Sequence, residues 1–400
     1  MSVRPRNALK RARDRLHDAV LLTAFVVFER VLPKRATAWC FCTWHNAYPH
    51  TIDNPRGVFE EVKNDPALVK TVLLKSPLGP DPGMRDGKNV RFVNVESLRG
   101  AYEMARSKVI ILGYGLSGIS SYARHLTRRH KLIQLWHGIP LKRIGKLFPG
   151  EDFWDAETLK YAATVCSSEQ DQELMGAAFA PVPHVWLTGL PRNDLIMKRE
   201  GDLPLDYQGQ LSALRKQIAG RKFILYAPTW RNEDSGIYPF SNDEWSSLEC
   251  YLRAHDATMG IRAHANRRRI GDSQDGPEDS AIFYVNSYPD ANLVLRLADI
   301  LVTDYSSIYI DFLLTGRPIL NFTYDLDSYV GERGFLYTLD EAMPDRPFRT
   351  FDELQRRLDA VFSGQELNLT QYEKAKRLFH GHSGEASKEV AERIRKLAAY

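Results

Sequence analysis

The residues of this sequence that are best suited to chemistry are cationic and hydroxyl side chains that follow runs of apolar residues. His137 follows such a run, Arg262 and His264 stand together in "IRAHA", and Ser306 and Ser307 follow "ILVTDY". An imidazole can accept a proton near neutral pH, a guanidinium binds phosphate through paired hydrogen bonds, and a serine hydroxyl donates to phosphate oxygens. Together these types favour an anionic, phosphate-bearing ligand.

The stretch "VTDYSSIYIDFLLTG" combines several features of a phosphate site. A strand is expected to end near Asp304, and Ser306 and Ser307 stand where a helix over 307–314 would begin. Serine is a preferred N-cap residue, and the free N–H groups and dipole of a helix N-terminus attract an anion. Asp311 lies four residues after Ser307 on the same helix face, where it can accept a hydrogen bond from a ligand hydroxyl. An ordinary N-cap is the alternative interpretation.

The stretch "LWHGIPLKRIG" places a histidine at the end of another expected strand. His137 is suited to act as a base or to donate a hydrogen bond to phosphate. Gly138 lets a ligand approach the backbone closely, and Pro140 fits the first turn of a following helix. A purely structural histidine is the alternative.

Three further clusters stand at expected strand ends. Arg192 in "LTGLPRND" is expected on an exposed loop, from which its guanidinium can bind phosphate. Pro228 and Thr229 in "LYAPTWRNED" end a strand, and Thr229 can cap the next segment or donate to phosphate. Arg262 and His264 are two residues apart on an expected strand and so share one face. The alternatives are a solvated loop arginine, a plain turn and a solvated edge strand.

The elements that must position these side chains alternate along the chain. Strand-like apolar runs are expected at 37–41, 69–74, 90–95, 108–113, 131–136, 222–229, 261–265, 281–286, 299–305 and 318–322, and helices at 54–64, 97–107, 242–255, 307–314 and 387–400. Such alternation predicts an α/β fold with parallel sheets, in which ligands bind at the carboxyl ends of the strands. The polar stretch 197–210 separates two such series. We therefore expect an N-terminal segment over 1–35, a first α/β domain over 36–205, and a second over 206–400. The C-terminal helix is grouped with the second domain, although it can pack back on either.

The composition is that of a folded globular protein. The chain has 400 residues, of which 44% are hydrophobic and 26% are charged, and its net charge is +4. This length allows two domains, and so small a charge does not favour nucleic acid as a partner. The four cysteines are too few for a disulfide framework, and no second Cys or His pair has metal-ligand spacing. We expect buried free thiols and infer no metal site.

The first residues of the chain are basic and are followed by an apolar run. Residues 1–17 contain six Lys or Arg and one Asp, and residues 19–28 read "AVLLTAFVVF". Ten apolar residues are too few to span a bilayer, which needs about 20. Charged residues at 29, 30, 34 and 35 weaken the interpretation as a signal peptide. Two interpretations remain, a helix at the surface of an anionic membrane and a docked helix with a basic solvated face.

The five clusters together resemble the CDP-glycerol glycerophosphotransferase family, which includes the teichoic acid primases and polymerases, and similar enzymes build poly(alditol phosphate) capsules. The similarity runs from "TIDNPRGVFEEV" to "RGFLY", and its most specific parts are "WHGIPLKRIG", "YAPTWR" and "VTDYSSIYIDFLLTGRPI". The resemblance implies a GT-B-like fold with two facing Rossmann-like domains and a cleft between them. The first domain would then lie on the acceptor side, and the second would bind a CDP-alditol donor.

The resemblance also implies the functional residues. His137 and His264 match the two essential histidines of the family. The family's donor-binding positions match His137, Gly138, Ile139, Pro140, Leu141, Arg192, Pro228, Thr229, Arg262, Ala263, His264, Ser306, Ser307 and Asp311. One departure is Ala265, where relatives often have proline, so the loop after His264 is expected to differ.

The expected reaction is transfer of glycerol phosphate, or another alditol phosphate, from CDP-glycerol or CDP-ribitol to a hydroxyl of a lipid-linked or polymer acceptor. His137 is expected to be the base, His264 and Arg262 to stabilise the pyrophosphate, and Asp311 to contact donor hydroxyls. We infer no required cofactor. The resemblance implies a peripheral enzyme on the cytoplasmic face of the membrane, and a homo-oligomer is compatible with it. The alternatives are a GT-B sugar transferase or nucleotide-sugar epimerase, and an inactive nucleotide-binding scaffold of a capsule assembly complex.

Overall fold

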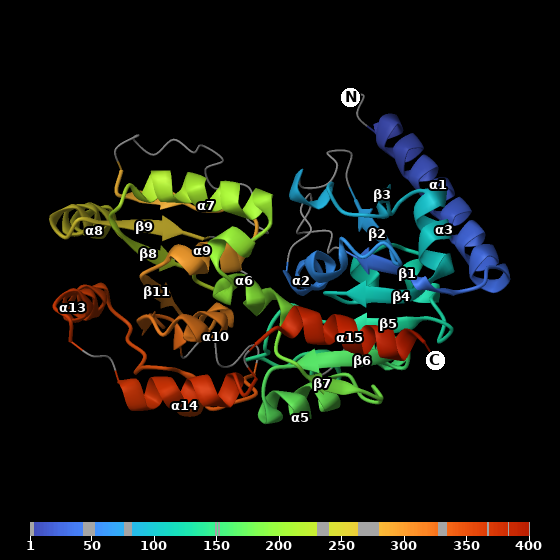
Figure 1. Ribbon diagram of the computed structural model, residues 1–400. Helices are drawn as coiled ribbons and strands as arrows, with labels where there is room; N and C mark the ends of the chain where they lie inside the picture. Colours follow the sequence, from blue (N-terminus) through green and yellow to red (C-terminus); the bar gives the residue numbers. More distant parts are fainter. Residues whose placement is uncertain are drawn as a thin grey trace.

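The computed structural model describes residues 4–42, 53–75, 82–148, 150, 153–229, 240–262, 280–326, 334–365, 368–382 and 384–399. These residues form two α/β units side by side, each built on a β-sheet with helices packed against it (Figure 1). The predicted fold class, two α/β units with parallel sheets, is confirmed.

The first unit contains seven parallel strands within the described residues, in the order β3-β2-β1-β4-β5-β6-β7. Its strands are β1 Arg35–Cys42, β2 Val69–Leu74, β3 Val90–Asn94, β4 Ser107–Leu112, β5 Lys131–Gln134, β6 Tyr161–Cys166 and β7 Val185–Leu187. Its helices are α1 Arg4–Val31, α2 Asp53–Val62, α3 Leu98–Arg106, α4 Phe153–Thr158 and α5 Glu169–Ala178. Strands β6 and β7 were not expected from the sequence, because their apolar runs are short and interrupted.

The second unit contains five parallel strands within the described residues, in the order β10-β9-β8-β11-β12. Its strands are β8 Lys222–Tyr226, β9 Ala257–Ile261, β10 Ile282–Tyr284, β11 Ile300–Thr303 and β12 Ile319–Asn321. The helices that follow the first sheet in the chain are α6 Asp194–Met197, α7 Leu205–Ile218, α8 Asn242–Ala254, α9 Ala291–Leu297, α10 Ile308–Phe312, α12 Leu339–Ala342, α13 Phe351–Phe362, α14 Leu369–Phe379 and α15 Ala386–Ala398.

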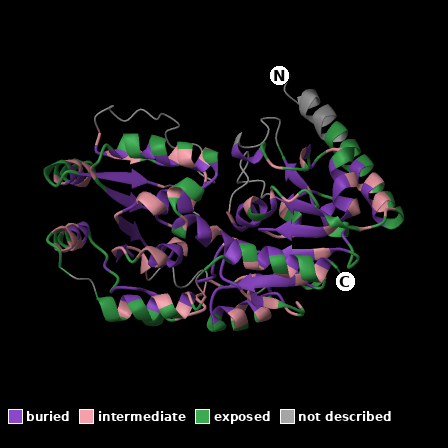
Figure 2. Ribbon diagram, in the orientation of Figure 1, coloured by how far each residue is buried: buried purple, intermediate pink, exposed green. Residues whose placement is uncertain are grey.

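The strands are apolar on both faces because helices cover both sides of each sheet, and most of their residues are buried (Figure 2). Local signals start several helices. The Ser97 hydroxyl accepts a hydrogen bond from the Gly100 N–H at 3.0 Å at the start of α3, and Ser241 and Glu244 form a capping box at the start of α8.

Helix α1 is docked on the first unit through its C-terminal half. Leu21 and Phe25 are buried in an apolar cluster that also contains residues of α3. The Glu29 carboxylate lies 2.6 Å from the Lys34 ammonium and 2.7 Å from the His130 ring. Burial alone would raise the pKa of Glu29, but the hydrogen bonds and charges of these neighbours lower it to about 2. The docked-helix interpretation is therefore correct for this half of α1.

The C-terminal helix differs from the expected domain assignment. We expected it with the second α/β domain, but α15 packs against α2, β4 and β5 of the first unit (Figure 1). The Asp194 carboxylate accepts hydrogen bonds from the N–H groups of Ala386 at 3.1 Å and Ser387 at 2.8 Å. A carboxylate from a distant part of the chain thus caps the start of α15, and local sequence holds no signal for such a contact.

Candidate active site

Arg192 lies where the two α/β units meet. It belongs to a short 3₁₀ turn, Pro191–Asn193, that follows the first sheet. Its guanidinium donates to the carbonyl oxygen of His137 in the first unit and pairs with the carboxylate of Asp311 in the second. The carboxylate of Asp53 lies 3.4 Å away. The prediction of an exposed loop arginine is wrong, because these carboxylates hold the side chain inside, where it is 12% exposed.

His137 stands three residues beyond Gln134, the last residue of β5, beside two aromatic rings. The Tyr114 ring is parallel to the imidazole, with centroids 4.4 Å apart and an interplanar angle of 7°. The Trp136 ring lies at 4.3 Å and is tilted by 35°. These rings restrict the orientation of the imidazole.

The turn after His137 needs glycine. Gly138 has φ +143, and a Cβ there would lie 2.6 Å from Nη2 of Arg192. Any side chain at this position would displace the arginine from its place under the turn. The helix expected after Pro140 does not form; the backbone N–H of Leu336 instead donates to the carbonyl of Leu141 at 3.0 Å. The "WHGIPLKRIG" motif therefore touches the second unit.

The side chains of Ile139 and Leu141 are buried in the apolar core of the protein, and Pro140 is also buried. A ligand at this turn therefore meets backbone groups of residues 139–141 and not their side chains.

Asp311 is a buried carboxylate beside a cation. It is 2% exposed and stands on the first turns of α10. Burial raises its pKa to about 6, while the charge of Arg192 opposes the rise and those of Asp53 and Asp290 add to it. Its Oδ1 is buried without a hydrogen-bond partner among the described residues. This oxygen can accept a hydrogen bond from a ligand hydroxyl.

Ser306 and Ser307 stand at the start of α10, as the sequence predicts, but neither is a strong cap. Ser307 holds the N-cap position without a capping hydrogen bond from its side chain, and the Ile308 N–H lies 3.5 Å from the Ser306 hydroxyl. The hydroxyl of Ser307 is therefore not committed to capping the helix.

Thr229 is bound to Asp304 at the carboxyl ends of neighbouring strands. Its backbone N–H and its hydroxyl both donate to the Asp304 carboxylate, at 2.8 Å and 2.6 Å. Pro228 is buried beside it. Because β8 pairs with β11, this contact ties the "YAPTWR" stretch to the residues that precede Ser306.

Arg262 is also at this edge of the second sheet, but it lies outside the strand. Strand β9 ends at Ile261, so the prediction that Arg262 lies within a strand is wrong. Its Nη1 and Nη2 donate to the carbonyl oxygens of Tyr288 at 2.7 Å and Pro289 at 2.8 Å. The remaining predicted residues of this cluster, Ala263 and His264, lie outside the described residues.

Four residues near these side chains were missed from the sequence, namely Asp53, Asn54, Tyr114 and Asp304. Asp304 stands inside the quoted serine motif, and its position at a strand end was the available signal. Tyr114 stands two residues after the end of β4, whereas Asp53 and Asn54 are the first residues of α2 and follow no predicted strand directly. Their chemistry is less distinctive than that of histidine or arginine.

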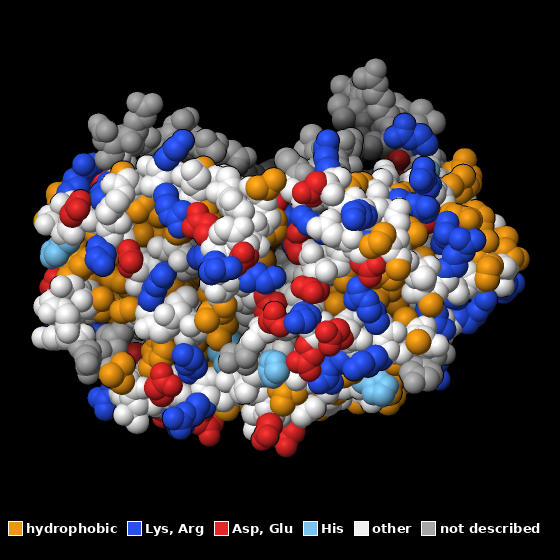
Figure 3. All heavy atoms as spheres, in the orientation of Figure 1, with side chains coloured by type: hydrophobic (Ala, Val, Ile, Leu, Met, Phe, Trp, Pro, Cys, Tyr) orange, Lys and Arg blue, Asp and Glu red, His pale blue; other side chains and the backbone are white. Residues whose placement is uncertain are grey.

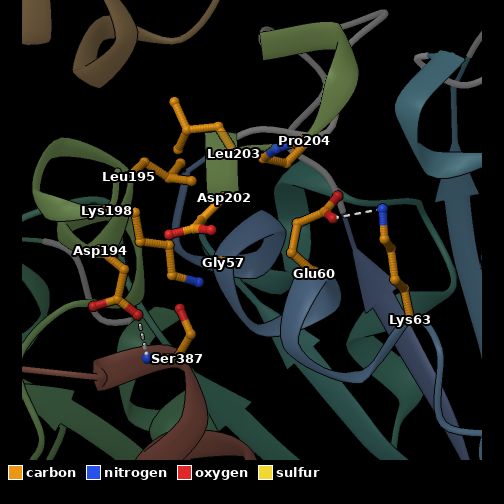
Figure 4. Close-up of a pocket in the computed structure, with 10 residues that line it drawn as sticks. All are labelled: Gly57, Glu60, Lys63, Asp194, Leu195, Lys198, Asp202, Leu203, Pro204 and Ser387. Carbon is orange, nitrogen blue, oxygen red and sulfur yellow. Dashed lines mark hydrogen bonds and ion pairs between the residues drawn. The ribbon is translucent and has the colours of Figure 1, made fainter. Parts of the chain in front are cut away.

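A separate cavity of about 180 Å³ lies beside residues 198–204, where the chain passes from the first unit to the second (Figure 4). Its lining includes Lys198, Asp202 and Leu203 from this segment, Glu60 from α2 and Ser387 from α15. Positive and negative side chains are mixed around it, so the lining favours no particular ligand. None of the predicted site residues lines this cavity.

The sequence matches one protein family over residues 24–396, described as CDP-glycerol:poly(glycerophosphate) glycerophosphotransferase. The chain belongs to this family. The matched range includes His137, Arg192 and Asp311, the three residues that meet between the two units.

Individual proteins agree with this assignment. The chain is 27% identical to the teichoic acid ribitol-phosphate polymerase TarL of Staphylococcus aureus (strain NCTC 8325 / PS 47) over 60% of this chain and 43% of TarL. It spans about half the length of the curated relatives it matches first.

Solved structures share the fold. A structure of the wall teichoic acid polymerase TagF with CDPG has a TM-score of 0.74 at 21% identity and covers 99% of this chain and 98% of that one. A UDP-N-acetylglucosamine 2-epimerase has a TM-score of 0.51 at 11% identity, over 92% of this chain and 97% of its own. The predicted GT-B-like fold is thereby confirmed.

Proposed function

We propose that the protein transfers an alditol phosphate, such as glycerol phosphate, from a CDP-alditol donor to a hydroxyl of a lipid-linked or polymer acceptor in teichoic-acid-like or capsular polymer synthesis. The observation that carries the proposal is the meeting of His137, Arg192 and Asp311 between the two units of a chain in this family. The name of TarL specifies ribitol phosphate and that of the family glycerol phosphate, so the proposal covers both donors.

In the proposed step the oxygen of the acceptor hydroxyl forms a bond to the β-phosphorus of the donor. The bond from that phosphorus to the oxygen shared with the α-phosphate breaks, and CMP leaves with this oxygen and the electron pair. The hydroxyl proton passes to His137, a general base of a kind that contributes roughly 10²–10⁴-fold to the rate. His264 is proposed to stabilise the negative charge on the leaving CMP.

The donor is held by the second unit in this proposal. Ser306 and Ser307 offer hydroxyls to the phosphate oxygens, and Oδ1 of Asp311 accepts from an alditol hydroxyl. The buried Nε of Arg192 has no hydrogen-bond partner among the described residues and can donate to a phosphate oxygen. Arg262 acts through its charge, since Nη1 and Nη2 already bind carbonyl oxygens.

We also propose that the protein is peripheral to the cytoplasmic face of the membrane, and the exposed face of α1 supports contact with a membrane surface. Four apolar residues of α1 are between 50% and 67% exposed, and we call them the outward stripe: Leu16, Val20, Val27 and Val31. Separations of 4, 11 and 15 residues place them on one face of a helix with about 3.6 residues per turn. This face is opposite the docked residues Leu21 and Phe25.

Basic side chains accompany the outward stripe. Arg13 and Arg30 are exposed on α1, and Figure 3 shows Lys and Arg side chains next to hydrophobic ones along the edge of the molecule that α1 forms. An apolar stripe flanked by cations suits the surface of an anionic bilayer. The described residues include no helix that has both the length and the apolar composition needed to cross a bilayer.

The proposed activity is tested with purified protein, CDP-glycerol or CDP-ribitol, and a panel of lipid-linked and polymer acceptors. We expect release of CMP and a mass gain of one alditol phosphate per transfer. His137→Ala and His264→Ala should each lower the rate by roughly 10²-fold or more, whereas the exposed His184→Ala should not. Turnover of UDP-sugars alone would favour the sugar transferase or epimerase alternative, and nucleotide binding without any turnover would favour the scaffold.

A further inference from the structure

Three consecutive backbone carbonyl groups next to the side chain of His137 are held by two other side chains. The amide nitrogen of Asn54 donates to the carbonyl oxygens of Leu135 and Trp136, each at 3.0 Å. The carbonyl oxygen of His137 accepts a hydrogen bond from Arg192. The backbone on both sides of the imidazole is therefore fixed by groups that come from other parts of the chain.

Asn54 also connects these two points of attachment. Its side-chain oxygen accepts a hydrogen bond from the backbone N–H of Arg192 at 3.0 Å. An asparagine amide has two N–H donors and one carbonyl acceptor, and here the nitrogen and the oxygen are both engaged. Asn54 is 0% exposed, so water cannot take over bonds that a substitution removes.

The bonds from Asn54 hold a backbone conformation that bulky residues rarely adopt. Trp136 has φ +54, in the left-handed region. Such a conformation persists only where the surroundings enforce it. The two carbonyl oxygens that Asn54 binds belong to Trp136 and to the residue before it, so Asn54 acts on the torsions that aim His137.

Asn54 is itself placed firmly at the start of α2. Its backbone N–H donates to the Asp53 carboxylate at 2.8 Å. One turn later, a Cβ on Gly57 would lie 2.7 Å from the carbonyl oxygen of Pro191, so α2 is packed closely against the turn that carries Arg192. Asn54 therefore cannot move without moving the helix.

We propose that Asn54 is a positioning residue for His137, acting through the backbone of residues 135–137. It holds the imidazole where that ring can take the proton of the acceptor hydroxyl, and to that extent the inference rests on the proposed function. A catalytic group that is misplaced by about 1 Å can lower the rate about 10²-fold. Loss of the bonds that fix the backbone beside His137 should therefore lower turnover more than it lowers donor affinity.

The first test separates turnover from donor binding. Asn54→Asp keeps the size of the side chain but, when ionised, cannot donate to either carbonyl, and Asn54→Ala removes the bonds without adding a charge. We expect each variant to lower kcat for CMP release about 10–100-fold, while the Kd for CDP-glycerol, measured by calorimetry, changes less than about threefold. If the melting curve of Asn54→Asp shows that this variant does not fold, Asn54→Ala provides the test.

The matched control is Asn89→Asp. The exposed Asn89 also donates from its amide nitrogen to a backbone carbonyl, that of Pro66 at 2.6 Å, but the bond lies away from His137. The control should keep normal kcat and Kd. A fall in donor affinity as large as the fall in kcat for the Asn54 variants would assign Asn54 to donor binding and overturn the proposal.

A second measurement does not depend on activity. In protein with ¹³C-labelled histidine, the resonance of the His137 ring can be assigned by its loss in His137→Ala. We expect it to move in both Asn54 variants and to stay in place in Asn89→Asp. An unmoved resonance in a folded Asn54 variant overturns the proposal whatever the activity. A moved resonance in a protein that transfers nothing would support the positioning and reject the proposed function instead.

Discussion

The ring of Tyr114 lies parallel to the imidazole of His137, with an interplanar angle of 7° and centroids 4.4 Å apart. Gln134, the last residue of β5, connects the two sides of this stack. Its amide nitrogen donates to the carbonyl of Tyr114 at 3.1 Å, and its amide oxygen accepts from the N–H of Trp136 at 2.9 Å. The stack therefore belongs to a framework that determines where the imidazole lies and how it is oriented.

The first prediction concerns this stack. Tyr114→Leu should lower kcat about 3–10-fold, because an aromatic pair is worth about 0.5–1.5 kcal/mol beyond its buried area. Tyr114→Phe keeps the ring and should be close to normal. The rate of CMP release measures both. A second stacked pair, Tyr251 and His255, lies at the C-terminal end of α8 with centroids 4.2 Å apart, so Tyr251→Leu is the matched control and should keep its rate. Equal rates for Tyr114→Leu and Tyr114→Phe would contradict the prediction.

The ion pair between Arg192 and Asp311 should matter for stability as well as for turnover. Arg192→Met removes the guanidinium that binds both Asp311 and the carbonyl of His137, and it leaves the buried Asp311 carboxylate without its cation. Breaking a buried pair in this way costs about 3–5 kcal/mol, which urea unfolding can measure. Arg215 pairs with Glu200 at the surface, and Arg215→Met should cost only about 0–1 kcal/mol. A similar cost at both sites would mean that Arg192 is not a buried link between the units.

A pH effect should arise from His380, whose Nε2 lies 2.6 Å from the carbonyl oxygen of Ile310 in α10. Burial lowers the pKa of His380 from 6.5 to about 4, although the bond to Ile310 opposes this change. Between these two values the unfolded chain binds a proton that the folded protein does not. The free energy of unfolding should therefore fall as the pH falls through this window, by about 1.4 kcal/mol per pH unit.

The variant His380→Gln removes the titrating group and keeps a side-chain N–H. Urea unfolding at several pH values should show that the free energy of unfolding falls less with falling pH in this variant than in the wild type. His184→Gln, at an exposed histidine, is the control and should show the same pH dependence of the free energy of unfolding as the wild type. An unchanged pH dependence in His380→Gln would show that other groups cause it.

The serines at the start of α10 should affect donor binding more than folding. Ser307 makes no capping hydrogen bond, so the double change Ser306→Ala and Ser307→Ala should cost less than the about 1 kcal/mol of a capping serine per site. Calorimetry with CDP-glycerol should show weaker binding. Ser241→Ala removes a true cap from α8 and should do the reverse, lowering stability without changing donor affinity. Unchanged affinity in the double variant would remove these serines from the proposed phosphate site.

The outward stripe of α1 should decide binding to vesicles. Changing its four residues to Gln leaves the docked Leu21 and Phe25 in place, so the protein should fold but sediment less with anionic vesicles. High salt should weaken sedimentation of the wild type, because charges are screened over about 10 Å at 0.1 M. Gln at the exposed Met197 and Leu205, away from α1, is the control. Equal, salt-insensitive recovery of all three proteins would refute the membrane contact.

A truncation that starts at Lys34 is a different experiment. It removes Leu21, Phe25 and Glu29, which are buried in the first unit. We expect it to lower the melting temperature, because it exposes the apolar surface that these side chains cover and removes the partner of His130. A truncated protein that melts at the wild-type temperature would show that this half of α1 adds nothing to the fold.

The order and class of most helices and strands can be predicted from local sequence. Apolar runs bounded by turn residues predict strands such as β4, and apolar residues at helical spacing predict helices such as α8. The stretch that contains Ser306 and Ser307 was correctly placed between a strand and a helix. These features depend on residues within one or two turns of each other, and such local relations can be read from spacing alone.

The contacts of the site residues, by contrast, depend on how distant parts of the chain pack together. Arg192 was expected in solvent because "GLPRND" reads as a polar loop, yet it binds Asp311, 119 residues away. Asn54 gave no signal, since its partners Leu135 and Arg192 lie 81 and 138 residues along the chain. The cap of α15 comes from Asp194, 192 residues before Ala386. Contacts at such separations depend on how two sheets and their helices pack together, and no local pattern specifies them.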